Sequence, residues 1–348
     1  MSPYLPAILL SSLGMGTLLT FASSHWLLAW MGLEISTIAI LPLMTQQHHP
    51  RAIEAATKYF LTQATAAAVI LFASTANAWA LGDWNISQTS HPLAVTIILL
   101  ALALKIGLAP MHLWLPEVLQ GLDLTTGLIL STWQKLAPFA LIYQIAPHTN
   151  PTLLISLGVL SALVGGWGGL NQTQLRKLMA FSTIGHWGWV IIILHFSPSL
   201  ALLNVVIYIA MTTAMFLSLK GMAATKINSL AMAWPKAPIL TLLAMLCLLS
   251  LGGLPPLTGF MPKWLILQEL MKQDLTVVAV TMAMSALLSL FFYLRLCYAM
   301  ALTISPNTAN TAAPWRLKST LMILPLAATI ILALMLLPIT PTTVALLS

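Results

Sequence analysis

Long apolar runs, separated by short polar segments, follow one another along almost the whole chain. A helix needs about 20 residues to cross the ~30 Å hydrocarbon core of a bilayer, and open strands are unsuitable there because backbone groups must be hydrogen-bonded internally. The pattern therefore predicts an all-α polytopic membrane protein that forms a single membrane domain over residues 1–348. About eleven transmembrane helices are expected, at residues 3–21, 25–44, 58–80, 93–120, 124–146, 151–170, 178–196, 199–220, 237–272, 275–303 and 318–338.

Two of these spans, 93–120 and 237–272, are too long for one crossing and contain prolines in KIGLAPMHLWLPE and LGGLPPLTGFMPK, so each is interpreted as a broken helix. Each break falls in the fourth of five consecutive spans. The pattern predicts two five-helix repeats, 3–146 and 151–303, followed by one C-terminal transmembrane helix at 318–338. Because five is odd, the second repeat must be inverted. Matching breaks in inverted repeats point to a transport site, although proline and glycine are also common in membrane helices generally.

Composition supports the membrane assignment. Only 6% of residues are charged and 59% are hydrophobic, with a mean hydropathy of +0.94, whereas soluble proteins carry about 25% charged residues. The net charge of +7 forms no concentrated basic patch, so we expect no nucleic-acid partner. With eleven spans, the basic loops all fall on one side; they hold Arg51, Lys58, Arg176, Lys177, Lys220, Lys226, Lys236, Arg316 and Lys318. The positive-inside rule places these loops and the N-terminus on the cytosol-equivalent side.

Four charged residues lie within the spans instead of at their ends: Glu34, Lys105, Lys135 and Lys263. At 1.5 Å per residue their depths are roughly 13–18 Å, near the middle of a ~30 Å core. A lysine stem reaches only about 6 Å, so we expect that none of these side chains reaches an interface. Each costs at least a few kcal/mol to insert, which marks intramembrane charges as candidate functional groups.

These residue types suit proton transfer. Burial favours the neutral form of a lysine and a nearby carboxylate favours the charged form, so a lysine between these influences can lose and regain a proton. A row of such groups at one depth predicts a proton relay. The alternative is a structural ion pair, but the single carboxylate of Glu34 cannot neutralise three amines. Hydroxyls near the lysine and histidine positions fit a hydrated track or bond back to their own helices; they are Ser131, Thr132, Ser182 and Thr183.

His112 and His186 are less decided, because an intramembrane histidine serves either as a relay group or as a hydrogen-bonding residue between helices. Glu117 and Asp123 follow the first break and are candidate proton-uptake groups. The sequence has no glycine-rich phosphate loop, no CxxC cluster and no paired intramembrane histidines. We therefore expect no cofactor, no metal and no redox centre in this chain. The two cysteines, Cys247 and Cys297, lie in apolar runs and are expected to be packing residues.

Several of these segments together resemble one known family. Five segments are similar to the subunit 2 family of mitochondrial NADH–ubiquinone oxidoreductase, respiratory complex I, in its animal form: WMGLEIST around Glu34, KYFLTQA from Lys58, ALKIGLAPMHLWLPEV around Lys105, STWQKLAP around Lys135 and LGGLPPLTGFMPKW around Lys263. The similarity covers essentially the whole chain. This family belongs to the antiporter-like subunits of the proton-pumping arm, which are related to multi-subunit sodium/proton antiporters.

The resemblance implies a role for each candidate residue. Glu34 and Lys105 would form a coupling pair, Lys135 the central relay group and Lys263 the lysine of the second broken helix, with His112 and His186 along the same axis. NADH, FMN, iron–sulfur clusters and ubiquinone would be used in other subunits, while this chain acts as part of an H⁺-translocating enzyme.

The resemblance also implies partners and a location. The first span corresponds to the fourth helix of bacterial relatives, so other core membrane-arm subunits and accessory subunits are expected to cover that flank within the lipid bilayer. The location would be the mitochondrial inner membrane, with the N-terminus and basic loops in the matrix. Two other functions stay open on the residues alone: a stand-alone cation/proton antiporter, and a structural spacer in a membrane complex. A cation site would typically consist of a carboxylate with unwound backbone carbonyls, and the presence of only one mid-membrane carboxylate, Glu34, disfavours the antiporter.

Overall fold

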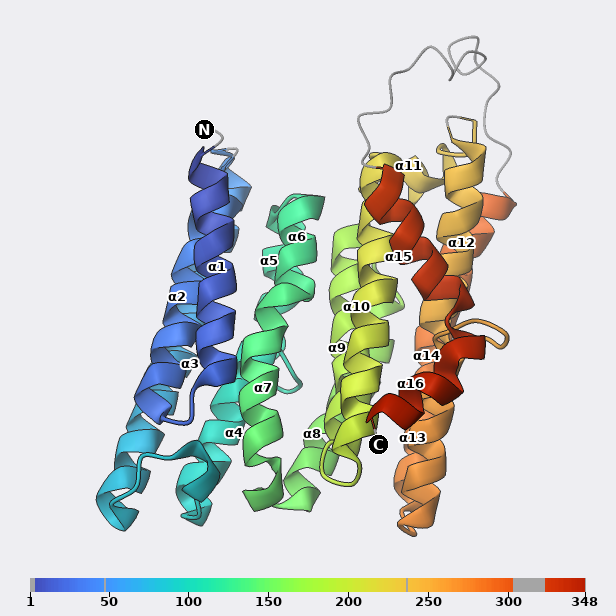
Figure 1. Ribbon diagram of the computed structural model, residues 1–348. Helices are drawn as coiled ribbons and strands as arrows, with labels where there is room; N and C mark the ends of the chain where they lie inside the picture. The colour runs from blue at the N-terminus through green and yellow to red at the C-terminus, as the bar shows by residue number, and fades with distance from the viewer. Residues whose placement is uncertain (1–3, 47, 236, 303–322, 348) are drawn as a thin grey trace. The chain divides into compact units, whose positions relative to one another are not determined.

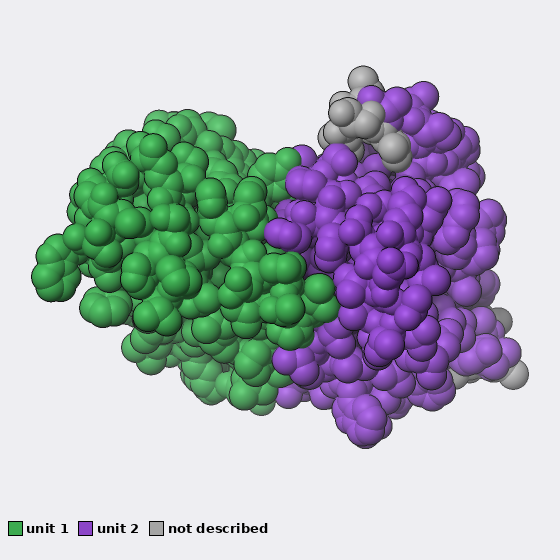
Figure 2. All heavy atoms as spheres, turned by 90° about the horizontal axis from the view of Figure 1, so that it is seen from below, with its two compact units in different colours: residues 1–158 green, residues 159–348 purple. Residues whose placement is uncertain are grey.

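The computed structural model describes residues 4–46, 48–235, 237–302 and 323–347, and within these ranges every regular element is a helix. The chain folds into two compact units, residues 1–158 and 159–348, shown in green and purple in Figure 2. Below, they are called unit 1 and unit 2. The predicted all-helical class is confirmed, whereas the number of membrane crossings and the inverted relation of two repeats stay predictions.

The described part of unit 1 contains eight helices in the order of Figure 1, where α8 includes the boundary with unit 2. They are α1 (Tyr4–Ala22), α2 (Trp26–Met44), α3 (Pro50–Leu81), α4 (Pro92–Ile106), α5 (Trp114–Gly121), α6 (Leu124–Ser131), α7 (Leu136–Ile145) and α8 (Pro151–Gly169), with short 3-10 turns η1 (Ile86–Gln88), η2 (Trp133–Lys135) and η3 (Ala146–His148). Helix α7 contacts α1, α2 and α4. Helices α1 and α2 approach closely because Gly16 and Gly32 face each other: a Cβ on either glycine would lie 2.8 Å from the other's carbonyl oxygen.

Unit 2 is arranged around the long helix α10, which contacts α9, α12, α13, α15 and α16. Its elements are α9 (Leu175–Ile193), α10 (Pro198–Gly221), α11 (Ile227–Ala231), α12 (Pro238–Gly252), α13 (Phe260–Lys272), α14 (Thr276–Ala301), α15 (Ile323–Met335), η6 (Leu337–Ile339) and α16 (Thr340–Leu347). The predicted span 318–338 corresponds to α15, and its first part, 318–322, lies outside the described residues, as do the basic-loop residues Lys236, Arg316 and Lys318.

Six described helices are long and apolar enough to cross a membrane: α1, α2, α3, α8, α10 and α14. Three shorter apolar helices, at Pro92–Ile106, Pro238–Gly252 and Leu324–Met335, include the first halves of the two predicted broken helices. Length and hydropathy alone therefore support a multi-pass membrane protein, with the broken helices falling below single-helix length because each is divided in two.

The two predicted breaks lie between α4 and α5 and between α12 and α13. Both first halves are 15 residues long, begin with a proline and end before a glycine in the left-handed conformation, Gly107 with φ +84° and Gly253 with φ +82°. Each glycine N–H donates to the carbonyl oxygen four residues earlier, and the next residue's N–H donates to the same oxygen, at Ala103 and Leu249. Glycine is favoured at both positions because an L-residue with a Cβ is strained there.

A further interruption was not predicted. The span 124–146 was expected to be continuous, but α6 ends at Ser131, a 3-10 turn spans Trp133–Lys135, and α7 starts at Leu136. The physical cause is Pro138: it has no N–H to donate to the carbonyl of Gln134, and its ring crowds that carbonyl. Lys135 thus lies at an irregular point of the backbone. The two broken helices are irregular in the same sense, between α4 and α5 and between α12 and α13.

Candidate functional site

Glu34 and Lys105 approach each other in unit 1 without forming a contact pair. Lys105 lies in the last turn of α4, directly before the break, and is 5% exposed. Its amine interacts electrostatically with Glu34 on α2, yet within the described chain it makes neither a hydrogen bond nor an ion pair. The Glu34 carboxylate instead accepts a long hydrogen bond of 3.4 Å from the Thr37 hydroxyl. This carboxylate is therefore near enough to influence the lysine and is not locked to it.

Lys135 is positioned by the interruption between α6 and α7. Its side chain is 2% exposed, among the largest buried side chains in the described protein. The neighbouring Gln134 amide donates to the Ser36 carbonyl oxygen at 2.8 Å, which ties this turn to α2 two residues beyond Glu34. Unit 1 thus brings the three predicted groups Glu34, Lys105 and Lys135 onto helices that pack together, since α7 contacts both α2 and α4.

The hydroxyls beside Lys135 do not all form the open track that the sequence suggested. Ser131 and Thr132 donate to the Leu128 carbonyl oxygen at 3.0 and 2.7 Å, so each bonds back to its own helix. In unit 2, Thr183 likewise donates to the Ala180 carbonyl at 2.7 Å. A serine or threonine inside an apolar helix commonly satisfies its donor in this way. Their oxygen atoms can still accept a hydrogen bond.

Lys263 lies on α13, but its amine reaches back across the second break to α12. The Lys263 Nζ donates to the carbonyl oxygens of Leu251 and Gly252 at 3.2 and 2.9 Å. These belong to the last turn of α12, where four carbonyl groups lack helical partners and the helix dipole is negative. A protonated Lys263 therefore caps α12 and joins the two halves of the broken helix.

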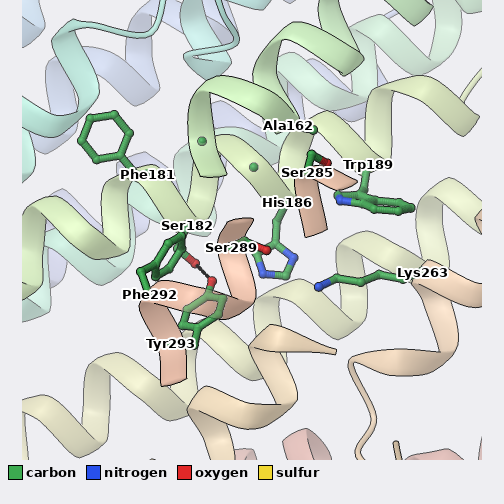
Figure 3. Close-up of a pocket in the computed structure, with 12 residues that line it drawn as sticks. Ala162, Phe181, Ser182, His186, Trp189, Lys263, Ser285, Ser289, Phe292 and Tyr293 are labelled. Carbon is green, nitrogen blue, oxygen red and sulfur yellow. Dashed lines mark hydrogen bonds between the residues drawn. The ribbon is translucent and has the colours of Figure 1, made fainter. Parts of the chain in front are cut away.

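A small cavity lies beside Lys263 in unit 2. It has a volume of about 10 Å³, roughly the space that one water molecule requires. Its lining comes from α8, α9, α13 and α14 and consists of Ala162, Gly165, Phe181, Ser182, Gly185, His186, Trp189, Lys263, Ser285, Ser289, Phe292 and Tyr293. Figure 3 shows the Lys263 amine pointing toward the His186 ring, and the two groups interact electrostatically. The structure thus brings together two residues that the sequence had proposed separately.

Ser182 forms a different bond from its neighbours. Its hydroxyl is hydrogen-bonded to the Tyr293 hydroxyl of α14 (Figure 3), so the pair bridges two helices. Tyr208 on α10 packs against the His186 and Trp187 rings, with ring centroids 5.7 and 5.8 Å apart. The His186 ring thus packs against Tyr208 and lines the same cavity as Lys263.

Two weaker sequence candidates have other surroundings. His112 lies in the turn after the first break, where its Nδ1 is 3.2 Å from the Pro110 carbonyl oxygen; no other hydrogen bond reaches its ring within the described residues. Glu117 accepts a hydrogen bond of 2.8 Å from Lys58, which also pairs with Glu54 at 2.7 Å. Lys58 was assigned to a loop, but α3 begins at Pro50, so it lies two turns inside the helix. Among the described residues, no hydrogen bond or ion pair joins Glu117 or His112 to Lys105 or Lys263.

Sequence reasoning missed Gln134 and Tyr293. Gln134 carries a buried amide beside a buried lysine, a polar pair in an apolar span that could have been noticed. Tyr293 gave no such signal, because a tyrosine in FFYLRL is equally compatible with an interfacial anchor. Its partner, Ser182, lies far away in the sequence, so only the fold brings the two together.

Comparison with known families identifies the class of protein. Residues 23–289 match the family model described as NADH:quinone oxidoreductase/Mrp antiporter, TM, and residues 290–344 match NADH dehydrogenase subunit 2 C-terminus. This chain is therefore a member of the antiporter-like family of membrane subunits. Among solved structures, respiratory complex I from Thermus thermophilus contains a similar chain, with 28% identity, a TM-score of 0.81, and coverage of 97% of this chain and 80% of that one.

Full-length relatives place it within one branch. The chain is 68% identical to NADH-ubiquinone oxidoreductase chain 2 of Oncorhynchus mykiss over 100% of both chains, and 61% identical to that of Squalus acanthias over 98% of both. It belongs to the NADH-ubiquinone oxidoreductase chain 2 family. A chain of the Mrp complex from Dietzia sp. has the same fold, with a TM-score of 0.81, 16% identity, and coverage of 97% of this chain and 74% of that one.

Proposed function

We propose that this chain is a membrane-arm subunit of a proton-pumping NADH:ubiquinone oxidoreductase and translocates protons across the mitochondrial inner membrane. Its relay groups are Glu34, Lys105 and Lys135 in unit 1, and Lys263 with His186 in unit 2. Electron transfer takes place in other subunits, and the chain itself binds no redox cofactor. Other membrane subunits of the same complex are its partners, and accessory subunits cover its exposed helices.

The observation that carries this proposal is the placement of the lysines at irregular points of the backbone. Lys105 precedes the first break, Lys135 lies in the 3-10 turn after α6, and Lys263 spans the second break. Interrupted helices supply backbone carbonyl groups that regular helices do not, and in membranes they are tolerated where they face protein or water. Amines at such points have acceptors available without competing for helical hydrogen bonds.

Glu34 supplies the coupling step. Its carboxylate influences Lys105 electrostatically without contact, so a movement of the carboxylate toward or away from the amine changes how strongly Lys105 holds its proton. A shift in that affinity displaces the proton toward the next group of the relay. Moving one charge against 100 mV requires about 2.3 kcal/mol, which is comparable with a pKa change of about two units.

Two features support the inverted-repeat and orientation proposals. The first halves of the two broken helices share their length, their initial proline and their left-handed glycine cap. In unit 2, Gln174 forms a β-bridge with Lys226, which places the beginning of α9 beside the segment after α10. Basic residues therefore gather at one end of this unit, and we propose that this end faces the mitochondrial matrix; they are Arg176, Lys177, Lys220 and Lys226.

The decisive experiment is Lys135→Met in the assembled complex, with NADH oxidation and proton release measured in sealed vesicles. We expect both coupled activities to fall while the complex remains assembled, because the variant keeps an unbranched side chain that is only one atom shorter and loses the titratable amine. Unchanged values of both would remove Lys135 from the mechanism. Loss of assembly without any loss of pumping per assembled complex would instead favour a structural spacer. Cation-dependent flux by this chain alone would favour a stand-alone antiporter.

A further inference from the structure

The cavity beside Lys263 has one polar pair that the proposed relay does not use. The hydroxyls of Ser182 and Tyr293 are hydrogen-bonded to each other, and their residues are 2% and 1% exposed. Most other buried serines and threonines of the described unit 2 donate to a carbonyl of their own helix, as Ser250 and Ser285 do at 2.8 and 2.7 Å. Ser182 and Tyr293 depart from this behaviour, so their arrangement requires a different explanation.

Counting donors shows what the pair can do. Two hydroxyl groups contain two protons, and one hydrogen bond between them uses only one. Within the described residues neither hydroxyl has a second hydrogen-bond partner. Leaving a buried donor unsatisfied costs about 1–3 kcal/mol. Both residues line the cavity, whose volume of about 10 Å³ is near the limit for one water molecule. The remaining hydroxyl proton can therefore be donated into the cavity that His186 and Lys263 also line.

The spacing along two helices makes the polar positions continuous. Ser182 and His186 are one turn apart on α9, and Ser285, Ser289 and Tyr293 are one turn apart from one another on α14. All five line the same cavity. In Figure 3, Ser289 lies beside His186. Ser285 is on one side of Ser289, and the hydroxyl pair is on the other. Polar groups thus run along the cavity past the His186 ring.

The hydroxyl pair lies at the end of this row that is nearer the basic end of unit 2. Two residues beyond Tyr293, the Arg295 guanidinium donates to the Leu170 carbonyl oxygen at 2.8 Å, in the segment after α8 and before α9. Arg176 and Lys177 begin α9 itself. Ser182 and Tyr293 therefore stand between the Lys263 cavity and the surface that carries the basic residues.

We propose that the Ser182–Tyr293 hydroxyl pair is a proton-relay element that connects the Lys263 and His186 cavity with the basic end of unit 2. This proposal rests on the proposed function and extends its path by one element. In each transfer, the first hydroxyl of the pair receives a proton from a donor and passes its own proton to the second hydroxyl. The second hydroxyl passes its own proton to the next acceptor, so both hydroxyls stay neutral and one proton is moved. No oxidant or co-reactant is needed. Rotation of the two hydroxyls then restores the starting orientation.

Tyr293→Phe in the assembled complex tests the proposal, because it removes the hydroxyl and keeps the ring that packs beside Phe292. We expect coupled proton release to fall about tenfold, below the 10²–10⁴-fold typical of a positioned proton-transfer group because water can partly replace a hydroxyl. Ser182→Ala should have the same effect, and the double variant should be no worse than either single variant, since the two groups act as one unit.

Tyr208→Phe is the matched control. Tyr208 is also buried and contacts the same His186 ring, but it does not line the cavity. We expect near-normal proton release from this variant. Equal losses in Tyr208→Phe and Tyr293→Phe would show that packing around His186 matters and would overturn the proposal. Loss of assembly in both Tyr293→Phe and Ser182→Ala would make the pair structural and would also overturn it.

Measurements on Lys135→Met in the same membranes distinguish a failure of the proposed function from a failure of the hydroxyl-pair proposal. If Lys135→Met abolishes pumping and both hydroxyl variants pump normally, only the relay role of Ser182 and Tyr293 fails. If Lys135→Met pumps normally, Lys135 is removed from the mechanism and the lysine relay of the proposed function fails with it. Tyr293→Phe should lower proton release per NADH and leave NADH oxidation in uncoupled membranes unchanged. That result would support the relay role of the hydroxyl pair specifically.

Discussion

Gly253 places the Lys263 amine at the end of α12, and its replacement by alanine tests whether this position matters. A Cβ at residue 253 would lie 2.9 Å from Lys263 Cδ and 3.0 Å from Nζ. Carbon atoms in normal contact are about 3.5–4.0 Å apart, so the lysine must move. The displacement threatens two hydrogen bonds, of 3.2 and 2.9 Å, to the Leu251 and Gly252 carbonyl oxygens.

The size of the effect follows from two contributions. The left-handed backbone, with φ +82° at Gly253, costs an alanine about 1–2 kcal/mol. Loss of one hydrogen bond to a charged group adds about 1.5–3 kcal/mol. Gly82→Ala is a matched control, because Gly82 also caps a helix with φ +80° and a Cβ there meets nothing within 4 Å. The difference between the two variants isolates the displacement of Lys263.

The assay is proton release and NADH oxidation by the assembled complex in sealed vesicles, together with thermal stability of the complex. We expect Gly82→Ala to lower stability by the backbone cost alone and to pump normally. Gly253→Ala should be less stable than Gly82→Ala by about 1.5–3 kcal/mol and should pump more slowly. Identical stability and pumping in the two variants would refute the role of the Lys263 cap.

Three further variants have expected outcomes. Gln134→Leu removes the amide that donates to the Ser36 carbonyl at 2.8 Å, so we expect a loss of about 1–3 kcal/mol in thermal stability and impaired pumping; normal pumping would separate this hydrogen bond from Lys135 function. Gly32→Val forces atoms against Gly16, whose carbonyl oxygen would lie 2.8 Å from the new Cβ, and should destabilise the α1–α2 contact by about 1–3 kcal/mol, seen as a lower melting temperature or poorer assembly. Lys58→Ala breaks two exposed ion pairs and should change stability little at physiological salt, as denaturation with and without added salt would show.

The two broken helices use their charged residues differently. Glu117 and Lys263 each lie ten residues after the glycine cap of their break, counting from Gly107 to 117 and from Gly253 to 263. Glu117 turns toward Lys58, whereas Lys263 returns to the preceding half-helix. Matching positions therefore hold opposite charges with different partners. The buried amine of the broken helix in unit 1, Lys105, lies on the first half, and that in unit 2, Lys263, lies on the second.

The sequence by itself determined the helical membrane class, the two breaks and the buried charges. Each of these depends on local properties: hydropathy over a window sets a span, and prolines with a left-handed glycine end a helix regardless of distant contacts. The interruption before Lys135 shows the limit of that reasoning, because its cause, Pro138, was present in the sequence. A single proline can either kink or break a helix, and neighbouring helices decide which occurs.

Only the tertiary structure decided which groups meet. The approach of Glu34 to Lys105 and the bond between Ser182 and Tyr293 join residues that are distant in the sequence, and the acceptors of the Lys263 amine lie on the other half of its broken helix. Hydropathy and spacing indicate that a polar side chain is buried, but they do not identify its partner. That partner depends on how the helices pack, and packing is set by close contacts such as the one between Gly16 and Gly32.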